Sequence, residues 1–305
     1  MLGAASNGFE SRLQLPPSKV TGVTGNEQCN YRVLICFHPA RVGKGPASVL
    51  NQTLELSIAM QERRKPLGMK NYGHIAHLPG SRMGPGDHSC ELGQARIATL
   101  KARDRHDHVI VQEKLDGTNV GVARVDGALY PLVRAGYVAD TSPFEQHWRF
   151  AQWVYSNQDR FLAVLRDGER LVGEWLMQAH GTRYQLKHEP FVGFDLMLGV
   201  ERAQHDDLIT RVALGDFVTP TVIHRGGPLS IENAMKKLNT YGFHGAIDEV
   251  EGAIWRVERN ELASPGKSGE RVWKVDFLVK YIRPDKEDGI YLPEISGRKP
   301  VWNWR

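Results

Sequence analysis

Several features that would place this 305-residue chain in a special class are scarce in it. It has only three cysteines, Cys29, Cys36 and Cys90, and no C-x-x-C spacing. An odd number of cysteines without that spacing indicates neither a disulfide framework nor a structural zinc site. Basic residues outnumber acidic ones only slightly, 39 against 35. The net charge of +4 is compatible with an anionic partner but does not identify one.

Long apolar runs are also absent. No stretch approaches the roughly 18 apolar residues of a membrane span, and the N-terminus, MLGAASNGFESRL, lacks the apolar core of a signal peptide. We therefore expect no membrane partner and a cytoplasmic location. The remaining composition, 41% apolar and 24% charged, is that of an ordinary globular protein.

The first part of the chain differs from the rest. Residues 1–68 contain Pro16-Pro17, scattered glycine and serine, and no sustained hydrophobic period. The stretch RVGKG at 41–45 lacks the glycine frame and the Ser/Thr of a P-loop, so we reject that interpretation. We interpret 1–68 as a poorly defined extension, either a mobile arm or a segment upstream of a true start at Met69. The functional domain is expected over 69–305.

From about residue 107 onward the sequence is rich in strand patterns. The candidate strands are 108–115, 119–125, 128–134, 171–177, 191–198, 252–257 and 272–281. Asp126-Gly127 is a strong hairpin signal between the second and the third. Helical spacing predicts a helix over 143–165, and Ser230 is a suitable N-cap for another over 231–238. Grouped strands with helices between them, without regular alternation, favour an α+β fold.

One stretch carries the first sign of chemistry. In VIVQEKLDGTNVGVARV, Lys114 and the polar residues after it separate two apolar, strand-like runs. A charged strand end followed by an Asp-Gly turn is the ordinary explanation of such a pattern. The functional explanation is a nucleophilic lysine, with Gly117 allowing the backbone to approach a ligand closely. K-x-D-G alone does not decide between them.

A nucleophilic Lys114 has a physical requirement. Lysine is protonated at neutral pH and attacks only when burial or nearby cations lower its pKa. Bringing the pKa from about 10.4 to near 7 takes about 4 to 5 kcal/mol of differential interaction. Burial, a metal ion, or cations such as Arg134, Lys280 and Arg283 must supply it.

Six segments in order resemble the motifs of the covalent nucleotidyltransferase superfamily, which includes polynucleotide ligases and capping enzymes. They are EKLDGTN at 113–119, VRAG at 133–136, LVGEW at 171–175, FVGFD at 191–195, EGAI at 251–254 and LVKY at 278–281. Each segment taken alone has a structural explanation, as the side of a strand or as core. Together they cover a little over half of the chain, and the Asn119 form of the first motif resembles nick-sealing RNA ligases.

This resemblance implies a nucleotidyltransferase fold, ATP-grasp-like, with antiparallel sheets flanked by helices. It also implies an ATP-dependent RNA ligase. Lys114 would attack the α-phosphate of ATP and release pyrophosphate, the AMP would pass to an RNA 5′-phosphate, and a 3′-hydroxyl would displace it. A nicked duplex is one form such a substrate takes, and RNA repair is the corresponding task. Few residues follow Lys280, so we expect no C-terminal OB domain.

The same resemblance implies the roles of further residues. Glu174 would bind the ribose hydroxyls and Phe194 would stack on adenine, while Lys280 would contact the α-phosphate. Mg²⁺ or Mn²⁺ would be held by Glu251, with Asp195 as a second candidate. The expected nucleotide-binding residues are Glu113, Asn119, Arg134, Glu174 and Phe194.

The chain departs from the pattern at one motif position. The fifth motif usually carries two lysines separated by one residue, and Leu278 occupies the first of these positions. Phosphate contact would then depend on Lys280, with help from Lys274 or Arg283. The alternatives are a DNA ligase, a capping-type enzyme, or a non-catalytic nucleic-acid-binding module of the same fold.

An upstream segment, GHIAHLPGSRMGPGDHSC, contains several potential metal ligands: His74, His77, Asp87, His88 and Cys90. Their spacing fits no common zinc site. The part HLPGSR resembles segments that precede the first motif in some ligases, so we expect a loop beside the nucleotide site. In that arrangement His77 and Arg82 would contact phosphates.

Overall fold

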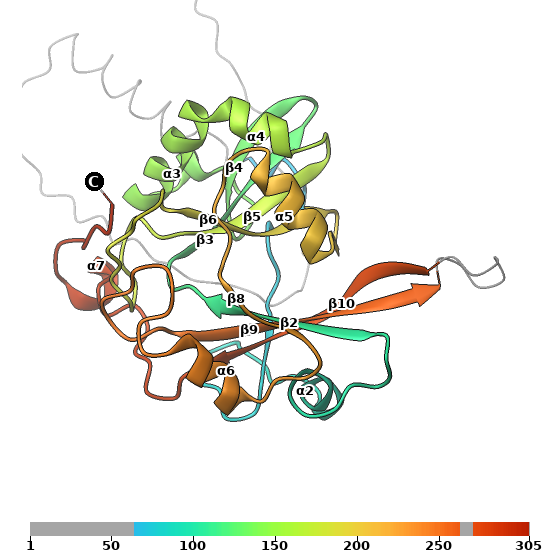
Figure 1. The fold of residues 1–305 in the computed structure, drawn as a ribbon. Helices are drawn as coiled ribbons and strands as arrows, with labels where there is room; N and C mark the ends of the chain where they lie inside the picture. Colours follow the sequence, from blue (N-terminus) through green and yellow to red (C-terminus); the bar gives the residue numbers. More distant parts are fainter. Residues whose placement is uncertain (1–63, 263–270, 305) are drawn as a thin grey trace, which may run out of the picture. The chain divides into compact units, whose positions relative to one another are not determined.

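The computed structural model describes residues 64–262 and 271–304 (Figure 1). The chain divides into two units, Met1–Leu56 and Ser57–Arg305, and every described residue belongs to the second. The prediction for 1–68 therefore falls mostly outside the described residues. Its described end is already part of the fold, because the N–H of Val138 donates to the carbonyl of Arg64 (3.0 Å) and Leu67 packs in a hydrophobic cluster. The folded unit thus begins no later than Arg64.

The first sheet has the strand order β1-β10-β9-β2-β8. Its strands are β1 (Ala76–His77), β10 (Arg271–Ile282), β9 (Gly252–Leu262), β2 (Asp107–Lys114) and β8 (Val222–Gly226). All pairs are antiparallel except β1 with β10. The pairing of β9 with β2 and β10 places the segments from three of the sequence motifs side by side.

The second sheet has the order β4-β3-β5-β6-β7 and is antiparallel throughout. Its strands are β4 (Ala128–Val133), β3 (Thr118–Val125), β5 (Glu169–Trp175), β6 (Phe191–Leu198) and β7 (Glu201–Arg202). The predicted hairpin is confirmed: Asp126 and Gly127 join β3 and β4 with φ of 51° and 79°. Two successive positive φ angles match the twist of the flanking strands.

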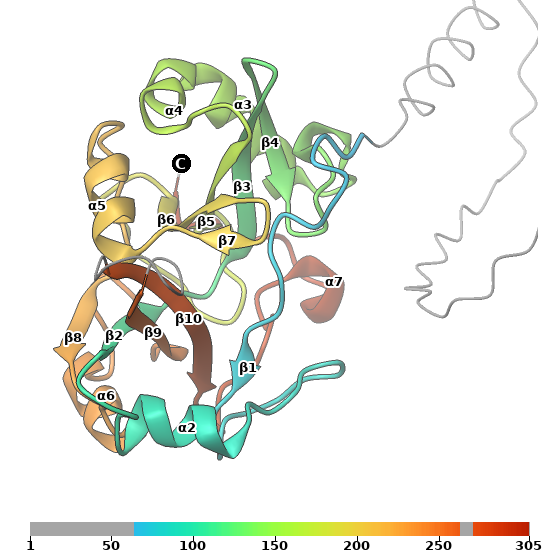
Figure 2. The ribbon, with the colours of Figure 1, turned by 90° about the vertical axis from the view of Figure 1, so that its right-hand side faces the viewer.

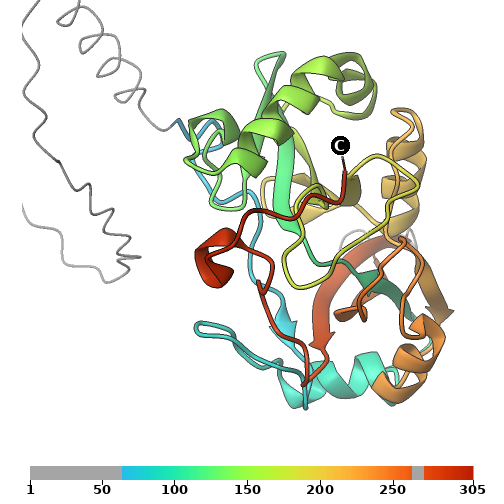
Figure 3. The ribbon, with the colours of Figure 1, turned by 90° about the vertical axis from the view of Figure 1, so that its left-hand side faces the viewer.

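Helices cover the two sheets separately, as Figures 2 and 3 show. The described helices are α2 (Leu92–Thr99), η1 (Ala139–Thr141), α3 (Glu145–Ser156), α4 (Gln158–Val164), α5 (His205–Ala213), α6 (Ile231–Leu238) and α7 (Pro293–Ser296). Helices α2 and α6 lie against the first sheet and α3, α4 and α5 against the second, whereas α7 buries no residue. The predicted α+β class with antiparallel sheets and flanking helices is confirmed. The helix over 231–238 is confirmed with its cap, because Ser230 Oγ accepts from the N–H of Asn233 (3.3 Å).

The single helix expected over 143–165 is instead two, α3 and α4. The backbone leaves the helical conformation at Asn157 (φ −122°, ψ 26°), and its side chain donates to the carbonyl of Trp153 (2.8 Å). This local hydrogen bond competes with the helix. The continuous apolar spacing reflects a shared buried face, since Phe150 and Phe161 belong to the same core cluster.

Two large hydrophobic cores result. One lies between the first sheet and the helices α2 and α6, and includes Trp255. The other lies between the second sheet and α3, α4 and α5, and contains a group of aromatic rings: Phe150, Trp153, Phe161, Trp175, Phe191 and Phe217. The C-terminal segment also packs there, since Trp302 pairs with Gln178. Within the described residues no helix has the length and apolar character needed to cross a bilayer.

Candidate active site

A cavity of about 510 Å³ is lined by residues from both sheets. Lys114 is the last residue of β2 in the first sheet, and Thr118 is the first residue of β3 in the second. The intervening residues carry the chain from one sheet to the other and line the cavity. Polar residues therefore gather between two apolar strands because the chain crosses the cavity at this point.

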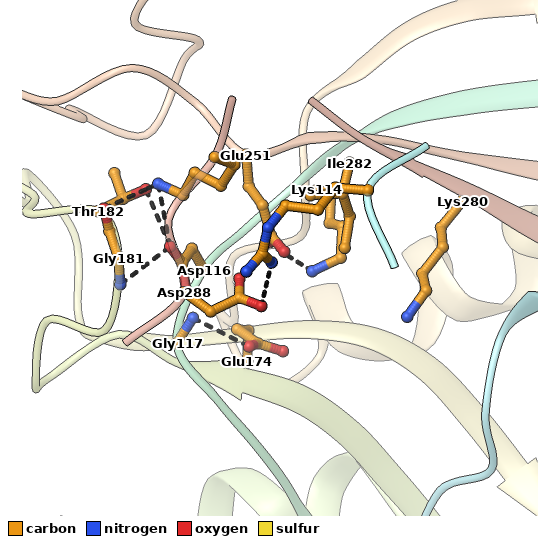
Figure 4. A network of polar contacts seen from close by, with 12 residues as sticks. Lys114, Asp116, Gly117, Glu174, Gly181, Thr182, Glu251, Lys280, Ile282 and Asp288 are labelled. Atoms are coloured by element: carbon orange, nitrogen blue, oxygen red, sulfur yellow. Dashed lines mark hydrogen bonds and ion pairs between the residues drawn. The ribbon is translucent and has the colours of Figure 1, made fainter. Parts of the chain in front are cut away.

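Lys114 is paired with Glu251 in this cavity. Its Nζ lies 2.5 Å from Glu251 Oε2, and the two side chains are 19% and 6% exposed. The pair forms because Lys114 lies opposite Gly252 in the β2–β9 register, which places the preceding Glu251 beside the lysine. Figure 4 shows the two side chains facing each other, with Lys280 nearby.

The protein groups alone do not lower the pKa of Lys114. Burial lowers it, but Glu251 and Glu174 act in the opposite direction and the net change is upward. Burial also raises the pKa of Glu251 and of Glu174 to about 7, although Lys114 opposes this. The condition required of a nucleophilic lysine is thus not met by the side chains alone. Two carboxyl groups, Glu174 and Glu251, lie beside Lys114, so the site would favour the binding of an additional cation.

Asp116, the acidic residue of K-x-D-G, is a structural anchor. Its Oδ2 accepts from the N–H of Gly181 and the hydroxyl of Thr182, both at 3.1 Å, and lies 3.2 Å from Lys286 Nζ. The N–H of Asp116 donates to the hydroxyl of Tyr184 (3.0 Å). These contacts attach the segment around 181–184 to the end of β2. Nothing in the sequence pattern identifies Lys286 as a partner.

Gly117 lies close to the backbone of a neighbouring strand. A Cβ at this position would lie 2.6 Å from the carbonyl oxygen of Trp175. This contact with a neighbouring strand requires glycine here, and the predicted close approach to a ligand stays a prediction. The N–H of Gly117 donates to Glu174 Oε1 (3.0 Å), which positions that carboxylate in the cavity (Figure 4).

Glu113 precedes Lys114, and its side chain is held outside the Lys114–Glu251 pair. Its Oε2 accepts from the N–H of Phe243 (2.9 Å), while Oε1 is buried without a hydrogen-bond partner among the described residues. Burial raises the pKa of Glu113 from 4.5 to about 7. Its predicted nucleotide contact stays a prediction; the contacts observed here are with the loop after α6.

A stability prediction follows for Glu113. Because its folded pKa is raised, the group favours folding fully below pH 4.5, and this contribution is lost as the pH rises toward 7. We expect Glu113→Gln to be about 2 kcal/mol more stable than the parent at pH 8 and nearly equal to it at pH 5. Urea unfolding at the two pH values measures this. An equal difference at both pH values would contradict it.

Asn119 and Phe194 line the cavity from the second sheet. The Oδ1 of Asn119 is buried without a hydrogen-bond partner in the described part of the chain. Phe194 is half-buried and contacts Tyr72 edge to face, with 5.2 Å between ring centroids. An unsatisfied polar atom and a partly exposed ring are features of a binding surface, because each gains a partner when a ligand enters.

Asp195 lies in a buried network. Its Oδ1 accepts from Arg256 (2.6 Å), and its Oδ2 accepts from the Tyr72 hydroxyl (2.5 Å) and from Arg202 (3.1 Å). Arg256 also bonds to Glu258 (2.8 Å). Both Asp195 oxygens are therefore engaged by the protein itself. Its predicted metal role stays a prediction, and these contacts give it a structural role.

The cavity wall carries some of the expected cations but not all of them. Lys280 and Arg134 line the cavity, and so does Leu278. Leu278 lies two residues before Lys280 and therefore on the same face of β10. Lys274 and Arg283 are not among its lining residues. The phosphate contact predicted for these two cations is therefore not available at the cavity wall.

The upstream segment lies beside the site but not in the predicted way. His77 is fully buried, with Nδ1 2.7 Å from Ser81 Oγ, and Arg82 pairs with Asp288. Neither lines the cavity, so the prediction that they contact phosphates is not supported by their positions. The described residues contain no group of three or more His, Cys, Asp or Glu able to hold a metal ion.

Several cavity residues carry no motif signal. His147 and His180 line the cavity, and burial lowers the pKa of both imidazoles, that of His147 to about 4. The Nε2 of His180 lies 3.0 Å from Thr118 Oγ1 and 3.1 Å from Gln146 Oε1. The isolated histidines could not be assigned from the sequence because their neighbours come from other parts of the chain.

Residues 107–282 match the RNA ligase family. The match covers more than half of the 305 residues, so the chain belongs to this family. This confirms the family predicted from the motifs. No curated protein matches.

Solved structures include distant likenesses. A Naegleria gruberi RNA ligase variant with ATP and manganese is 14% identical, with a TM-score of 0.42, over 75% of this chain and 64% of that one. The same ligase with pyrophosphate is 16% identical (TM-score 0.42; 73% and 62% covered). An archaeal ATP-dependent RNA ligase is 16% identical (TM-score 0.34; 58% and 43% covered). The chain spans less than two thirds of these ligases. Likenesses this weak carry no argument about function.

Proposed function

We propose that this protein is an ATP-dependent RNA ligase in which Lys114 forms a covalent lysyl-AMP. The observation that carries the proposal is the placement of Lys114 inside a cavity at the junction of two sheets, paired with Glu251 at 2.5 Å. A solvated lysine at a strand end would have neither a cavity nor a buried carboxylate partner. Membership of the RNA ligase family supports the same chemistry.

The cavity walls suit a nucleotide. In the proposed arrangement, Phe194 stacks on adenine, Glu174 accepts from the ribose hydroxyls, and the unsatisfied Asn119 Oδ1 gains a donor. Lys280 and Arg134 supply positive charge for the phosphates. Phosphoryl transfer is accelerated mainly by positioning and by cations on the nonbridging oxygens, so these residues provide what the reaction needs.

A divalent ion fits this site only together with its substrate. The described residues offer no three-ligand cluster, but Glu251 is a buried carboxylate facing the cavity. Mg²⁺ typically uses one or two carboxylates together with water and substrate phosphates. Glu251 would hold Mg²⁺ or Mn²⁺ in this way, with Asp195 engaged in its arginine network. The ion would stabilise negative charge on the phosphates and weaken the hold of Glu251 on the Lys114 ammonium.

The proposed reaction has three balanced steps. The Lys114 ammonium first loses a proton. The resulting amine forms an N–P bond to the α-phosphorus of ATP, and the bond between that phosphorus and the leaving pyrophosphate breaks. The AMP then transfers to an RNA 5′-phosphate, which breaks the N–P bond and frees the lysine. Finally a 3′-hydroxyl attacks that 5′-phosphate, and AMP leaves. The first step requires deprotonation of an ammonium that Glu251 now stabilises, so nucleotide binding must shift this balance.

Incubation with ATP labelled at the α-phosphate and Mg²⁺ or Mn²⁺, followed by a denaturing gel, tests the proposal. We expect a labelled band, with AMP located by mass spectrometry on the peptide containing Lys114. ATP labelled at the γ-phosphate is the control and must give no band. Folded protein that stays unlabelled with every metal tried would overturn the proposal. Nicked RNA and nicked DNA then distinguish an RNA ligase from a DNA ligase.

One observation favours a second candidate, a non-catalytic nucleic-acid-binding module. Leu278 presents an apolar side chain where a second lysine is expected. A binder would show salt-dependent RNA affinity without any covalent adduct. The same labelling experiment separates the two functions.

Leu278 leads to a prediction of its own. Because it shares the cavity side of β10 with Lys280, Leu278→Lys places a second ammonium near the phosphates. We expect the ATP concentration that gives half-maximal adduct formation to fall about threefold to tenfold. Leu278→Met, which adds no charge, is the control and should leave that concentration nearly unchanged. A rise in the lysine variant would contradict the prediction.

A further inference from the structure

Few cavity cations are available for a phosphate. The cationic side chains that line the cavity within the described residues are Lys114, Arg134, Arg256 and Lys280. Lys114 is paired with Glu251, and Arg256 with Asp195 and Glu258. Arg134 is exposed. Lys280, with its side chain only 13% exposed, has a longer carboxylate contact, 3.5 Å to Asp87, and is therefore the sheltered cation most available to substrate.

Asp87 lies directly beside Lys280. Its Oδ1 is 3.5 Å from Lys280 Nζ, while its Oδ2 accepts from the N–H of Gly84 (3.0 Å) and lies 3.1 Å from His77 Nε2. The two oxygens thus have different partners: Oδ2 is fixed by Gly84 of the same segment, and Oδ1 faces Lys280. Burial would raise the pKa of Asp87, but Gly84, Lys280 and His77 outweigh it and lower the pKa to about 2.

The segment that carries Asp87 is attached to the backbone of the same lysine. His77 pairs with Lys280 in the parallel β1–β10 register, and the N–H of Leu78 donates to the Lys280 carbonyl (2.8 Å). Ser81 Oγ accepts from the N–H of Ile282 (2.9 Å) and contacts His77 Nδ1. Backbone and side chain of Lys280 are therefore positioned by one element.

The protonation of His77 is consistent with this arrangement. Burial, followed by Lys280, lowers the pKa of His77, so the imidazole is neutral at pH 7. Its Nδ1 contacts Ser81 Oγ (2.7 Å), and its Nε2 faces Asp87. No described group meets hydrogen-bond geometry at Nε2, so the 3.1 Å contact is a close electrostatic approach. His77 orients Asp87 without neutralising it.

We propose that Asp87 is a positioning residue that holds the Lys280 ammonium inside the cavity, ready for the nucleotide phosphate. This inference depends on the proposed ligase function. It concerns a segment outside residues 107–282, over which the chain matches its family. In a chain with Leu278 in place of the second lysine, Lys280 has the larger share of the phosphate contact, and its placement matters correspondingly more.

The charges around Lys280 determine the sign of the effect. The groups that face it are Lys114, Arg134, His74, His77, Glu251 and Asp87. Burial and then Lys114 lower the pKa of Lys280, and Asp87 acts against them. Without the Asp87 charge, burial and Lys114 still act on Lys280, so the pKa of Lys280 is expected to fall. An opposite charge at this range typically shifts a pKa by about one to three units.

Asp87→Asn tests the proposal, with Asp276→Asn as the matched control. Asp276 lies on the same strand β10 and pairs with Arg103 at 2.5 Å, outside the cavity wall. In single-turnover adduct formation, we expect Asp87→Asn to raise the half-saturating ATP concentration about fivefold or more. The alkaline limb of the rate profile should move about one unit to lower pH. Asp87→Glu should recover part of both, and the control should change neither.

A second readout does not require turnover. Reductive methylation with ¹³C-formaldehyde labels the lysines, and the Lys280→Arg variant identifies the Lys280 signal. Its pKa, followed by NMR, should be lower in Asp87→Asn than in the parent. An unchanged Lys280 pKa, or unchanged ATP dependence while the parent forms adduct, would overturn the inference. If the parent forms no adduct, the ligase proposal fails, and the NMR titration still decides the role of Asp87.

Discussion

Lys114→Ala is expected to reduce formation of the AMP adduct to background, a loss of at least about a thousandfold, because no other group supplies the attacking nitrogen. The reason is geometric: within the described residues, Lys114 is the cavity lysine held beside Glu251, and Lys280 lies on another strand beside Asp87. The measurement is the labelled band from α-labelled ATP, normalised to folded protein by circular dichroism.

The alanine variant also leaves Glu251 buried without its partner, so a second variant separates chemistry from folding. Lys114→Arg keeps a positive charge next to Glu251 but cannot act as an amine nucleophile. It should be as inactive as the alanine variant and closer to the parent in stability. Lys101→Ala, at an exposed lysine outside the cavity, should label normally. Label retained in either Lys114 variant would assign the nucleophile elsewhere.

Asp195→Ala is expected to destabilise the fold by about 3 to 5 kcal/mol, because it leaves Arg256 buried with one of its carboxylate partners removed. Arg256 is 1% exposed and Asp195 is fully buried, so water cannot replace the lost contact. The substitution also removes the acceptor of the Tyr72 hydroxyl. Urea unfolding monitored by tryptophan fluorescence measures the change.

This variant also discriminates between the two roles of Asp195. If Asp195 were chiefly a metal ligand, Asp195→Ala would unfold at nearly the parent urea concentration and require more Mg²⁺ for adduct formation. Asp207→Ala, at an exposed aspartate of α5, is the control for removing a carboxylate from this region and should stay within about 0.5 kcal/mol of the parent. A parent-like midpoint for Asp195→Ala would contradict the structural role.

Charge balance links the site residues. Burial raises the pKa values of the Glu174 and Glu251 carboxyl groups, and both groups raise the pKa of Lys114 and so favour its protonated form. In the proposed function, Lys114 would stay protonated and inactive until other cations arrive. A ligase that binds ATP together with a divalent ion receives those cations at the moment when the amine is needed. If the protein is the proposed ligase, this arrangement would couple activation of Lys114 to substrate binding.

Local sequence patterns predicted most of the strands, one hairpin, one helix start and the family resemblance. Alternating apolar residues predicted the long strands, Asp126-Gly127 predicted the β3–β4 hairpin, and Ser230 predicted the start of α6, because turn geometry and capping depend on adjacent residues. The order of the six motifs resembled the covalent nucleotidyltransferase superfamily, the Asn119 form of the first motif pointed to RNA ligases, and the same motifs marked Lys114 and Glu251.

The ion-pair partners of the site residues follow from the tertiary structure. Asp87 meets Lys280, Lys286 meets Asp116, and Asp195 meets Arg256, although each pair is far apart in the sequence. Strand pairing and the crossing of the chain between two sheets create these contacts, and neither is encoded in the spacing of neighbouring residues. Burial, which raises the pKa of Glu113 and keeps His77 neutral, likewise arises only when distant segments close over a side chain.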